Sequence, residues 1–187
     1  IYHSIGISPS EVRHQGKNWE EKIIAGAAYD RVVAVGETGL DYYRKFGDKD
    51  SQIALFIRQL ELAQQLNLPV IIHNREAGQD ILEILRHRLP SRSGVLHCFS
   101  EDWEYAKKAI DLGMYISFSG NVTYKTAKNL HETARNMPLE NMLIESESPF
   151  MVPAEYKGKR NKPAYIHSTA EFIAALRGMD VEETADI

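Results

Sequence analysis

Acidic and histidine side chains follow short apolar runs of this sequence, where they could together bind a divalent metal ion. Four such residues lie at or just after the ends of four different runs: Glu37, His73, His97 and Glu147. Imidazole nitrogens and carboxylate oxygens are the ligands that Zn²⁺, Mn²⁺ and Mg²⁺ accept in proteins. One histidine after a strand is more often structural, but four residues of these types at four strand ends favour a metal site.

Such a site needs a scaffold that brings strand ends together, and the rest of the sequence predicts one. Apolar, β-branched runs of strand length recur at Ile1–Ile7, Val32–Gly36, Pro69–His73, Gly94–Phe99, Met114–Ser119 and Met142–Glu145. Helical periodicity alternates with them at Trp19–Tyr29, Ser51–Leu66, Gln79–Arg88, Trp103–Leu112, Thr126–Asn136 and His167–Arg177. This alternation predicts an α/β fold around a parallel sheet, whose carboxyl-terminal strand ends carry the active site.

Length and composition narrow the class of protein. The chain has 187 residues, of which 43% are hydrophobic and 26% charged. These values are typical of a globular domain, so we expect a single domain over residues 1–187. No apolar run approaches the roughly 18 residues of a membrane span. The lone Cys98 and the lack of a signal-peptide pattern favour a reducing, cytoplasmic location.

Charge limits how this chain could bind nucleic acid. With 22 basic and 26 acidic residues, its net charge is −4, so binding would need a local positive site. The irregular, polar segment Phe150–Ala164 offers one, because it contains Lys157, Lys159, Arg160 and Lys162. Irregular segments of this length inside a domain are more often functional than not.

Five motifs resemble those of the TatD-like metal-dependent deoxyribonuclease family. They are GETGLDYY at Gly36–Tyr43, PVIIHNR at Pro69–Arg75, LHCFS at Leu96–Ser100, SGNVT at Ser119–Thr123 and KGKRNKP at Lys157–Pro163. The motifs occur in the family's order and extend over essentially the whole chain. The resemblance implies a TIM-type (β/α) barrel with one or two divalent metal ions. It also implies hydrolysis of DNA as substrate, single-stranded or at 3′ ends, often by a 3′→5′ exonuclease.

The resemblance also implies individual roles. Glu37 matches a carboxylate that bridges two metal ions, and His73 and His97 match two imidazole ligands of one of them. Glu147 stands where the family has an Asp that binds metal and helps to activate water, so Glu37 and Glu147 are the expected catalytic residues. Four residues fall where the family contacts substrate phosphate: Arg75, Lys159, Arg160 and Asn161.

The sequence departs from the family pattern in two respects. It begins at the segment that corresponds to the family's third strand, so the family's opening H-x-H ligand pair has no counterpart. A complete barrel has eight strand–helix units in about 250 residues, and we count about six here. Glu147 is also one methylene longer than the family's Asp. We therefore expect an N-terminally truncated barrel with at most one well-formed metal site and weakened or absent nuclease activity.

Two other functions remain open. The chain could be an amidohydrolase-like enzyme that cleaves a small ester or amide, since barrels of this type support many reactions. It could also be a non-catalytic protein that binds phosphate or a partner through a degenerate site. The basic side chains of residues 157–162 favour a phosphodiester over a neutral amide.

Overall fold

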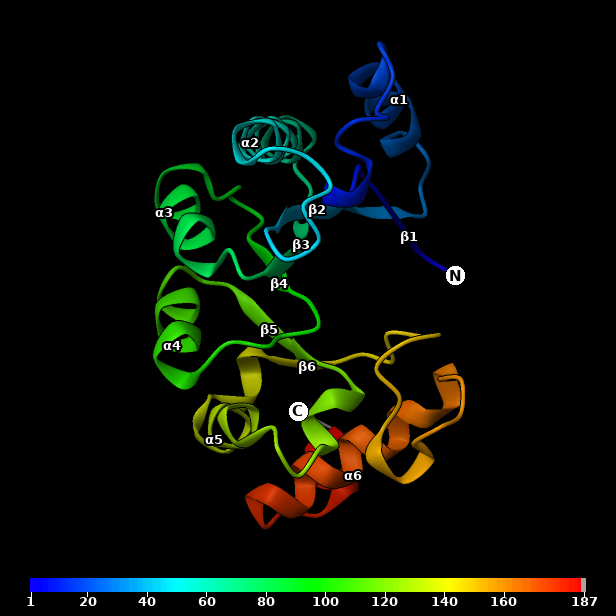
Figure 1. The fold of residues 1–187 in the computed structure, drawn as a ribbon, viewed down its shortest axis with the longest axis vertical. Coiled ribbons are helices and arrows are strands. Elements are labelled where there is room, and N and C mark those ends of the chain that lie inside the picture. Colours follow the sequence, from blue (N-terminus) through cyan, green and yellow to red (C-terminus); the bar gives the residue numbers. More distant parts are fainter. Residues whose placement is uncertain (186–187) are drawn as a thin grey trace. The chain divides into compact units, whose positions relative to one another are not determined.

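The computed structural model describes residues 1–185. The chain divides into two compact units, one of residues 1–96 and 112–114 and one of residues 97–111 with the chain from 115 onward. Each unit is built from parallel strands joined by helices (Figure 1). None of the helices in residues 1–185 is both long and apolar enough to cross a membrane. The expectation of a single domain stays a prediction.

The first unit contains four strands, which pair in parallel in chain order. They are β1 (His3–Ile5), β2 (Val32–Asp41), β3 (Val70–Arg75) and β4 (Gly94–Leu96). The helices between them are α1 (Trp19–Ala27), α2 (Lys49–Leu66) and α3 (Gly78–Arg88), and a short 3-10 helix, η1 (Pro9–Glu11), follows β1. The predicted alternation of parallel strands and helices is therefore confirmed here.

The second unit repeats the pattern with β5 (Tyr115–Phe118) and β6 (Met142–Ile144), which also pair in parallel. Its helices are α4 (Trp103–Asp111), α5 (Lys128–Asn136), α6 (Ile166–Arg177) and α7 (Val181–Ala185). Four 3-10 helices complete it: η2 (Gly120–Thr123), η3 (Leu139–Asn141), η4 (Ala154–Tyr156) and η5 (Pro163–Tyr165). The segment predicted to be irregular thus holds η4 and the start of η5.

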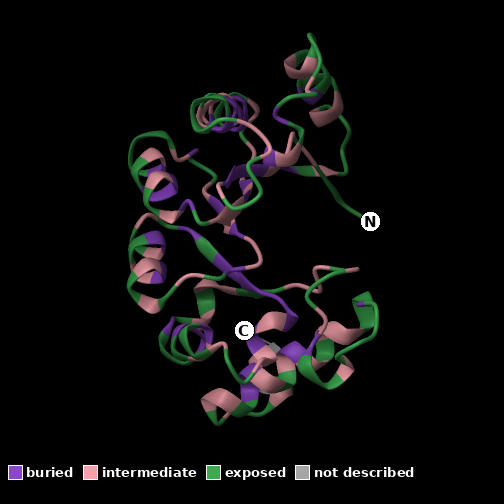
Figure 2. Ribbon diagram, viewed as in Figure 1, coloured by how far each residue is buried: buried purple, intermediate pink, exposed green. Residues whose placement is uncertain are grey.

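Burial follows the periodicity of the sequence. On α2, the side chains of Phe56, Leu60 and Ala63 recur at helical spacing and are completely buried. Figure 2 shows buried residues on the helices α2, α3 and α5, whose other residues are intermediate or exposed. Asp48 ends the preceding turn and caps α2, since its Oδ1 accepts a hydrogen bond of 2.8 Å from the Ser51 amide.

Strand β2 is longer than the sequence predicts. We expected it to end at Gly36, but it continues to Asp41, with a register shift against β3 between Val35 and Thr38. Gly39 pairs with His73, and a Cβ at Gly39 would lie 2.1 Å from the His73 carbonyl oxygen. Only glycine allows this approach at a φ of +125°. Gly39 thus allows β2 to pair with β3 beyond the predicted end of the strand.

Candidate metal centre

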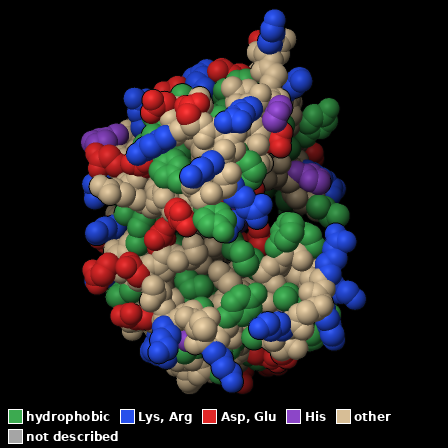
Figure 3. Space-filling view, viewed as in Figure 1, with side chains coloured by type: hydrophobic (Ala, Val, Ile, Leu, Met, Phe, Trp, Pro, Cys, Tyr) green, Lys and Arg blue, Asp and Glu red, His purple; other side chains and the backbone are tan. Residues whose placement is uncertain are grey.

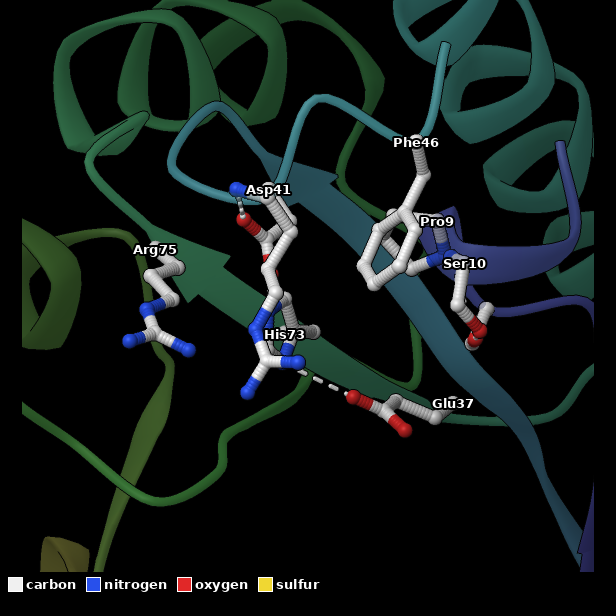
Figure 4. A pocket seen from close by; sticks show the side chains of 9 residues that line it. Pro9, Ser10, Glu37, Asp41, Phe46, His73 and Arg75 are labelled. Carbon is white, nitrogen blue, oxygen red and sulfur yellow. Dashed lines mark hydrogen bonds and ion pairs between the residues drawn. The ribbon is translucent and has the colours of Figure 1, made fainter.

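Glu37 and His73 come together in the first unit because β2 and β3 are neighbours. His73 Nδ1 lies 2.8 Å from Glu37 Oε1 (Figure 4). The side chains are 25% and 39% exposed for His73 and Glu37, respectively, so both are accessible from solvent. They offer one nitrogen and one oxygen donor side by side, as the predicted metal site requires.

Asp41, the last residue of β2, is a site residue to which the sequence analysis gave no role. Its side chain is only 4% exposed, and its Oδ2 lies 3.2 Å from Nε2 of His73. Its Oδ1 accepts a hydrogen bond of 2.8 Å from the Arg44 amide. The sequence did carry a signal for Asp41. Side chains two positions apart on a strand lie on the same face, so residues 37, 39 and 41 share a face when one strand includes all three. That signal could be used only once the strand was known to extend to residue 41.

The chain just after Asp41 is held by a second polar contact. The Tyr42 hydroxyl donates a 2.5 Å hydrogen bond to Asp80 Oδ2, and Lys49 Nζ lies 2.8 Å from the same oxygen. Burial, and then the nearby Asp80 carboxylate, raises the pKa of Tyr42. The phenol therefore stays protonated at neutral pH and continues to donate this bond.

Glu37, Asp41 and His73 line a cavity of about 200 Å³. Figure 4 shows Arg75 and Phe46 at this cavity together with Glu37, Asp41 and His73. The Arg75 guanidinium lies 4.0 Å from the centroid of the Tyr43 ring. The positively charged side chain of Arg75 thus lies at the same cavity as two possible metal ligands, Glu37 and His73. This placement is in keeping with the predicted phosphate contact of Arg75, which stays a prediction.

The second unit also contains a set of possible metal ligands. His97 Nδ1 lies 3.4 Å from Glu145 Oε1 and 3.8 Å from Glu147 Oε2. One ligand atom from each of the three residues lies within 4.8 Å of the others. Metal–ligand bonds of about 2.0–2.6 Å place neighbouring donors about this far apart, so the set fits one divalent ion. Sequence reasoning assigned a role to Glu147 but not to Glu145, which lies closer to the imidazole.

Asn161 connects the basic segment to the turn that carries Glu147. It is only 4% exposed, and its side-chain amide nitrogen donates to the carbonyl oxygens of Ser146 and Phe150. Its Oδ1 accepts a 2.8 Å bond from the Lys162 amide. The structure thus gives Asn161 a structural role inside the protein, and its expected phosphate contact stays a prediction.

The basic side chains of this segment are on the surface. Lys157, Lys159, Arg160 and Lys162 are all exposed. Lys159 Nζ lies 5.6 Å from the ring centroid of Tyr156, which stacks on Tyr165 with 3.7 Å between centroids. Elsewhere basic and acidic side chains are interspersed over the visible face (Figure 3), consistent with the small net charge.

Comparison with known proteins tests the resemblance. The chain is 48% identical over 162 residues to the uncharacterized metal-dependent hydrolase YcfH of Escherichia coli, and the match covers 86% of the chain and 61% of YcfH. It is 32% identical over 196 residues to the 3′-5′ ssDNA/RNA exonuclease TatD of Rahnella, covering 100% of the chain and 73% of that protein. The chain thus spans less than two thirds of the length of YcfH.

The fold agrees with these relatives. The crystal structure of YJJV, a TatD homologue from Escherichia coli, superposes with a TM-score of 0.92 at 29% identity. The superposition covers 99% of this chain and 72% of that one, which confirms the α/β, TIM-type prediction. The model of the family described as TatD related DNase matches residues 1–187. Because the family model matches the whole chain and the relatives share its sequence and fold, the protein belongs to the TatD-related DNase family.

Proposed function

We propose that this chain is a divalent-metal-dependent hydrolase of nucleic-acid phosphodiester bonds. The proposed metal ligands are Glu37, His73, His97 and Glu147, to which the structure adds Glu145. The observation that carries the proposal is the set of His97, Glu145 and Glu147, whose ligand atoms lie within 4.8 Å of one another. Two carboxylates and an imidazole match the preferences of Mn²⁺, Mg²⁺ and Zn²⁺.

Each group has a distinct task in this proposal. When bound, a divalent ion supplies Lewis-acid polarisation and lowers the pKa of water. Glu147, which is 32% exposed, accepts a proton from the attacking water. Arg75, Lys159 and Arg160 neutralise the charge that develops on the phosphoryl oxygens.

We propose single-stranded DNA, attacked from its 3′ end, as the substrate. The similarity to the Rahnella exonuclease supports this choice, as do the exposed basic side chains of residues 157–162. An amidohydrolase-like enzyme that acts on a neutral amide has less support, because such a substrate has no charge for these side chains to neutralise. The lone Cys98 supports action in a reducing compartment such as the cytoplasm.

A 5′-labelled single-stranded oligonucleotide tests the activity. We expect Mn²⁺ or Mg²⁺ to support weak, stepwise shortening from the 3′ end, and His97→Ala to abolish it. His87→Ala is the matched control, because His87 is exposed on α3, where it pairs with Glu83 at 3.5 Å. Activity that survives His97→Ala would remove the metal assignment, and activity absent from the unsubstituted chain would refute the nuclease proposal.

Calorimetric titration with Mn²⁺ tests the number of sites separately. We expect at most one tight site, because the four ligands proposed from the sequence supply enough donor atoms for a single four-coordinate ion. Two tight sites would contradict the expectation of at most one metal site, without affecting the family assignment.

A further inference from the structure

We infer that Asp41 is a positioning residue that fixes the orientation and proton of His73, so that His73 presents Nδ1 to a divalent cation beside Glu37. The inference deepens the proposed function and rests on it, since it concerns how a proposed ligand is prepared for metal. Neither the sequence motifs nor the family match assigns Asp41 a role.

The two carboxylates lie on opposite sides of the imidazole. Figure 4 shows Glu37 and Asp41 flanking His73. Glu37 Oε1 is 2.8 Å from Nδ1, and Asp41 Oδ2 is 3.2 Å from Nε2. A carboxylate oxygen can only accept a hydrogen bond, and a neutral imidazole has one N–H, so His73 can donate to only one of the two carboxylates. Asp41 is 4% exposed and has no access to solvent cations, whereas Glu37 is 39% exposed, so we assign the proton to Nε2 and leave Nδ1, beside Glu37, for a cation.

The position of the Asp41 carboxylate is fixed by buried contacts. The Asp41 amide donates a 2.8 Å bond to Gln52 Oε1, and Gln52 Nε2 returns one of 3.1 Å to the Asp41 carbonyl oxygen. Gln52 lies on α2 and is 1% exposed. The bonds to α2 thus fix the backbone of residue 41, and the bond from the Arg44 amide to Oδ1 holds the carboxylate, which cannot turn away from His73 without breaking it.

A direct ligand role for Asp41 fits the geometry less well. Its side chain is 4% exposed, whereas that of Glu37 is 39% exposed. One of its oxygens accepts from the Arg44 amide, and the other faces His73. A buried carboxylate needs such partners, and here they account for both oxygens. The arrangement matches the carboxylate–histidine pairs that orient imidazole ligands around metals.

The substitution Asp41→Asn tests this role, because it replaces one oxygen by a donor while keeping the shape. The Arg44 amide fixes which end faces which partner, since the remaining oxygen must continue to accept from it. The introduced NH₂ group then faces Nε2 of His73 and donates to it. The imidazole must move its proton to Nδ1, the nitrogen proposed to bind the cation.

Calorimetry with Mn²⁺ measures the consequence. We expect Asp41→Asn to weaken Mn²⁺ binding by about 10- to 100-fold. Asp80→Asn is the matched control, because Asp80 accepts from Tyr42 and Lys49 in the same unit but faces no proposed ligand. Thermal unfolding of both variants checks that the chain is folded. Unchanged Mn²⁺ affinity in folded Asp41→Asn would overturn the inference.

A spectroscopic measurement separates orientation from a general structural effect. Cadmium–nitrogen couplings in NMR spectra of the Cd²⁺-loaded, isotope-labelled chain identify the ligating nitrogen, and His73→Gln assigns the signal. We expect coupling to Nδ1 of His73 and a retained proton on Nε2, whereas coupling to Nε2 would overturn the inference. No metal binding by the unsubstituted chain would refute the proposed function and the inference together. Normal metal binding in which Cd²⁺ couples to Nε2 of His73 would refute the inference alone.

Discussion

Replacing Asn161 by alanine should destabilise the turn that carries Glu147. The side chain makes three hydrogen bonds to backbone groups, donating to the carbonyl oxygens of Ser146 and Phe150 and accepting from the Lys162 amide. Each such bond contributes about 1 kcal/mol net, and a buried group left unpaired costs at least as much. We therefore expect Asn161→Ala to lower the free energy of unfolding by about 3 kcal/mol.

Urea and thermal unfolding provide the assay for this substitution. For a chain of this size, about 3 kcal/mol corresponds to a fall in Tm of roughly 6–12 °C. Asn129→Ala is the control, because Asn129 is exposed on α5, and it should change stability by no more than about 0.5 kcal/mol. A loss of less than about 1 kcal/mol in Asn161→Ala would show that water replaces these bonds, and would refute the reasoning.

Two further predictions concern the first unit. Gly39→Ala should destabilise the chain by several kcal/mol in thermal unfolding, because its Cβ would lie 2.1 Å from the His73 carbonyl oxygen. Gly158→Ala is the control, because Gly158 has a φ of +89° and a Cβ added there would meet nothing within 4 Å among the described residues, so this variant measures the backbone strain alone. Equal losses of stability in the two variants would contradict the argument from the close contact. The hydrogen bond from Lys49, and then that from Tyr42, holds the pKa of Asp80 below its usual range. The stability that this carboxylate contributes is therefore present above the unfolded pKa of about 3.9 and lost as pH falls through the lower folded value. Asp80→Asn should thus cost up to about 1 kcal/mol in urea unfolding at neutral pH and less in acid, and a cost that does not vary with pH would exclude this linkage.

The order of elements was predictable because each has a local signature. Helix α2 was expected at Ser51–Leu66 and is found at Lys49–Leu66, since its apolar residues recur at helical spacing and Asp48 caps it. The end of β2 was wrong by five residues for an equally physical reason. Glycine within a strand usually indicates a break, and only the pairing of Gly39 with His73 shows that β2 continues.

The site was predictable in its residue types but not in its contacts. His97 and Glu147 were expected together, and the structure brings Nδ1 of His97 within 3.8 Å of Glu147. Glu145, whose carboxylate lies closer to His97 than that of Glu147, was not singled out. Two acidic residues separated by one position in the sequence give no indication of which one faces the imidazole of His97. Asn161 was expected to contact substrate phosphate, and only the fold of the preceding turn shows that it is buried.

The sequence by itself determined the α/β class, the succession of strands and helices, and the family, because these depend on local periodicity and on motifs. It also determined the types of metal-binding groups. The tertiary structure alone decided which atoms meet: Asp41 and His73 are 32 residues apart, and their 3.2 Å contact depends on the register between β2 and β3. Register is set by the packing of whole strands, so the assignment of His73 Nδ1 to Glu37 and Nε2 to Asp41 could not be read from the motif.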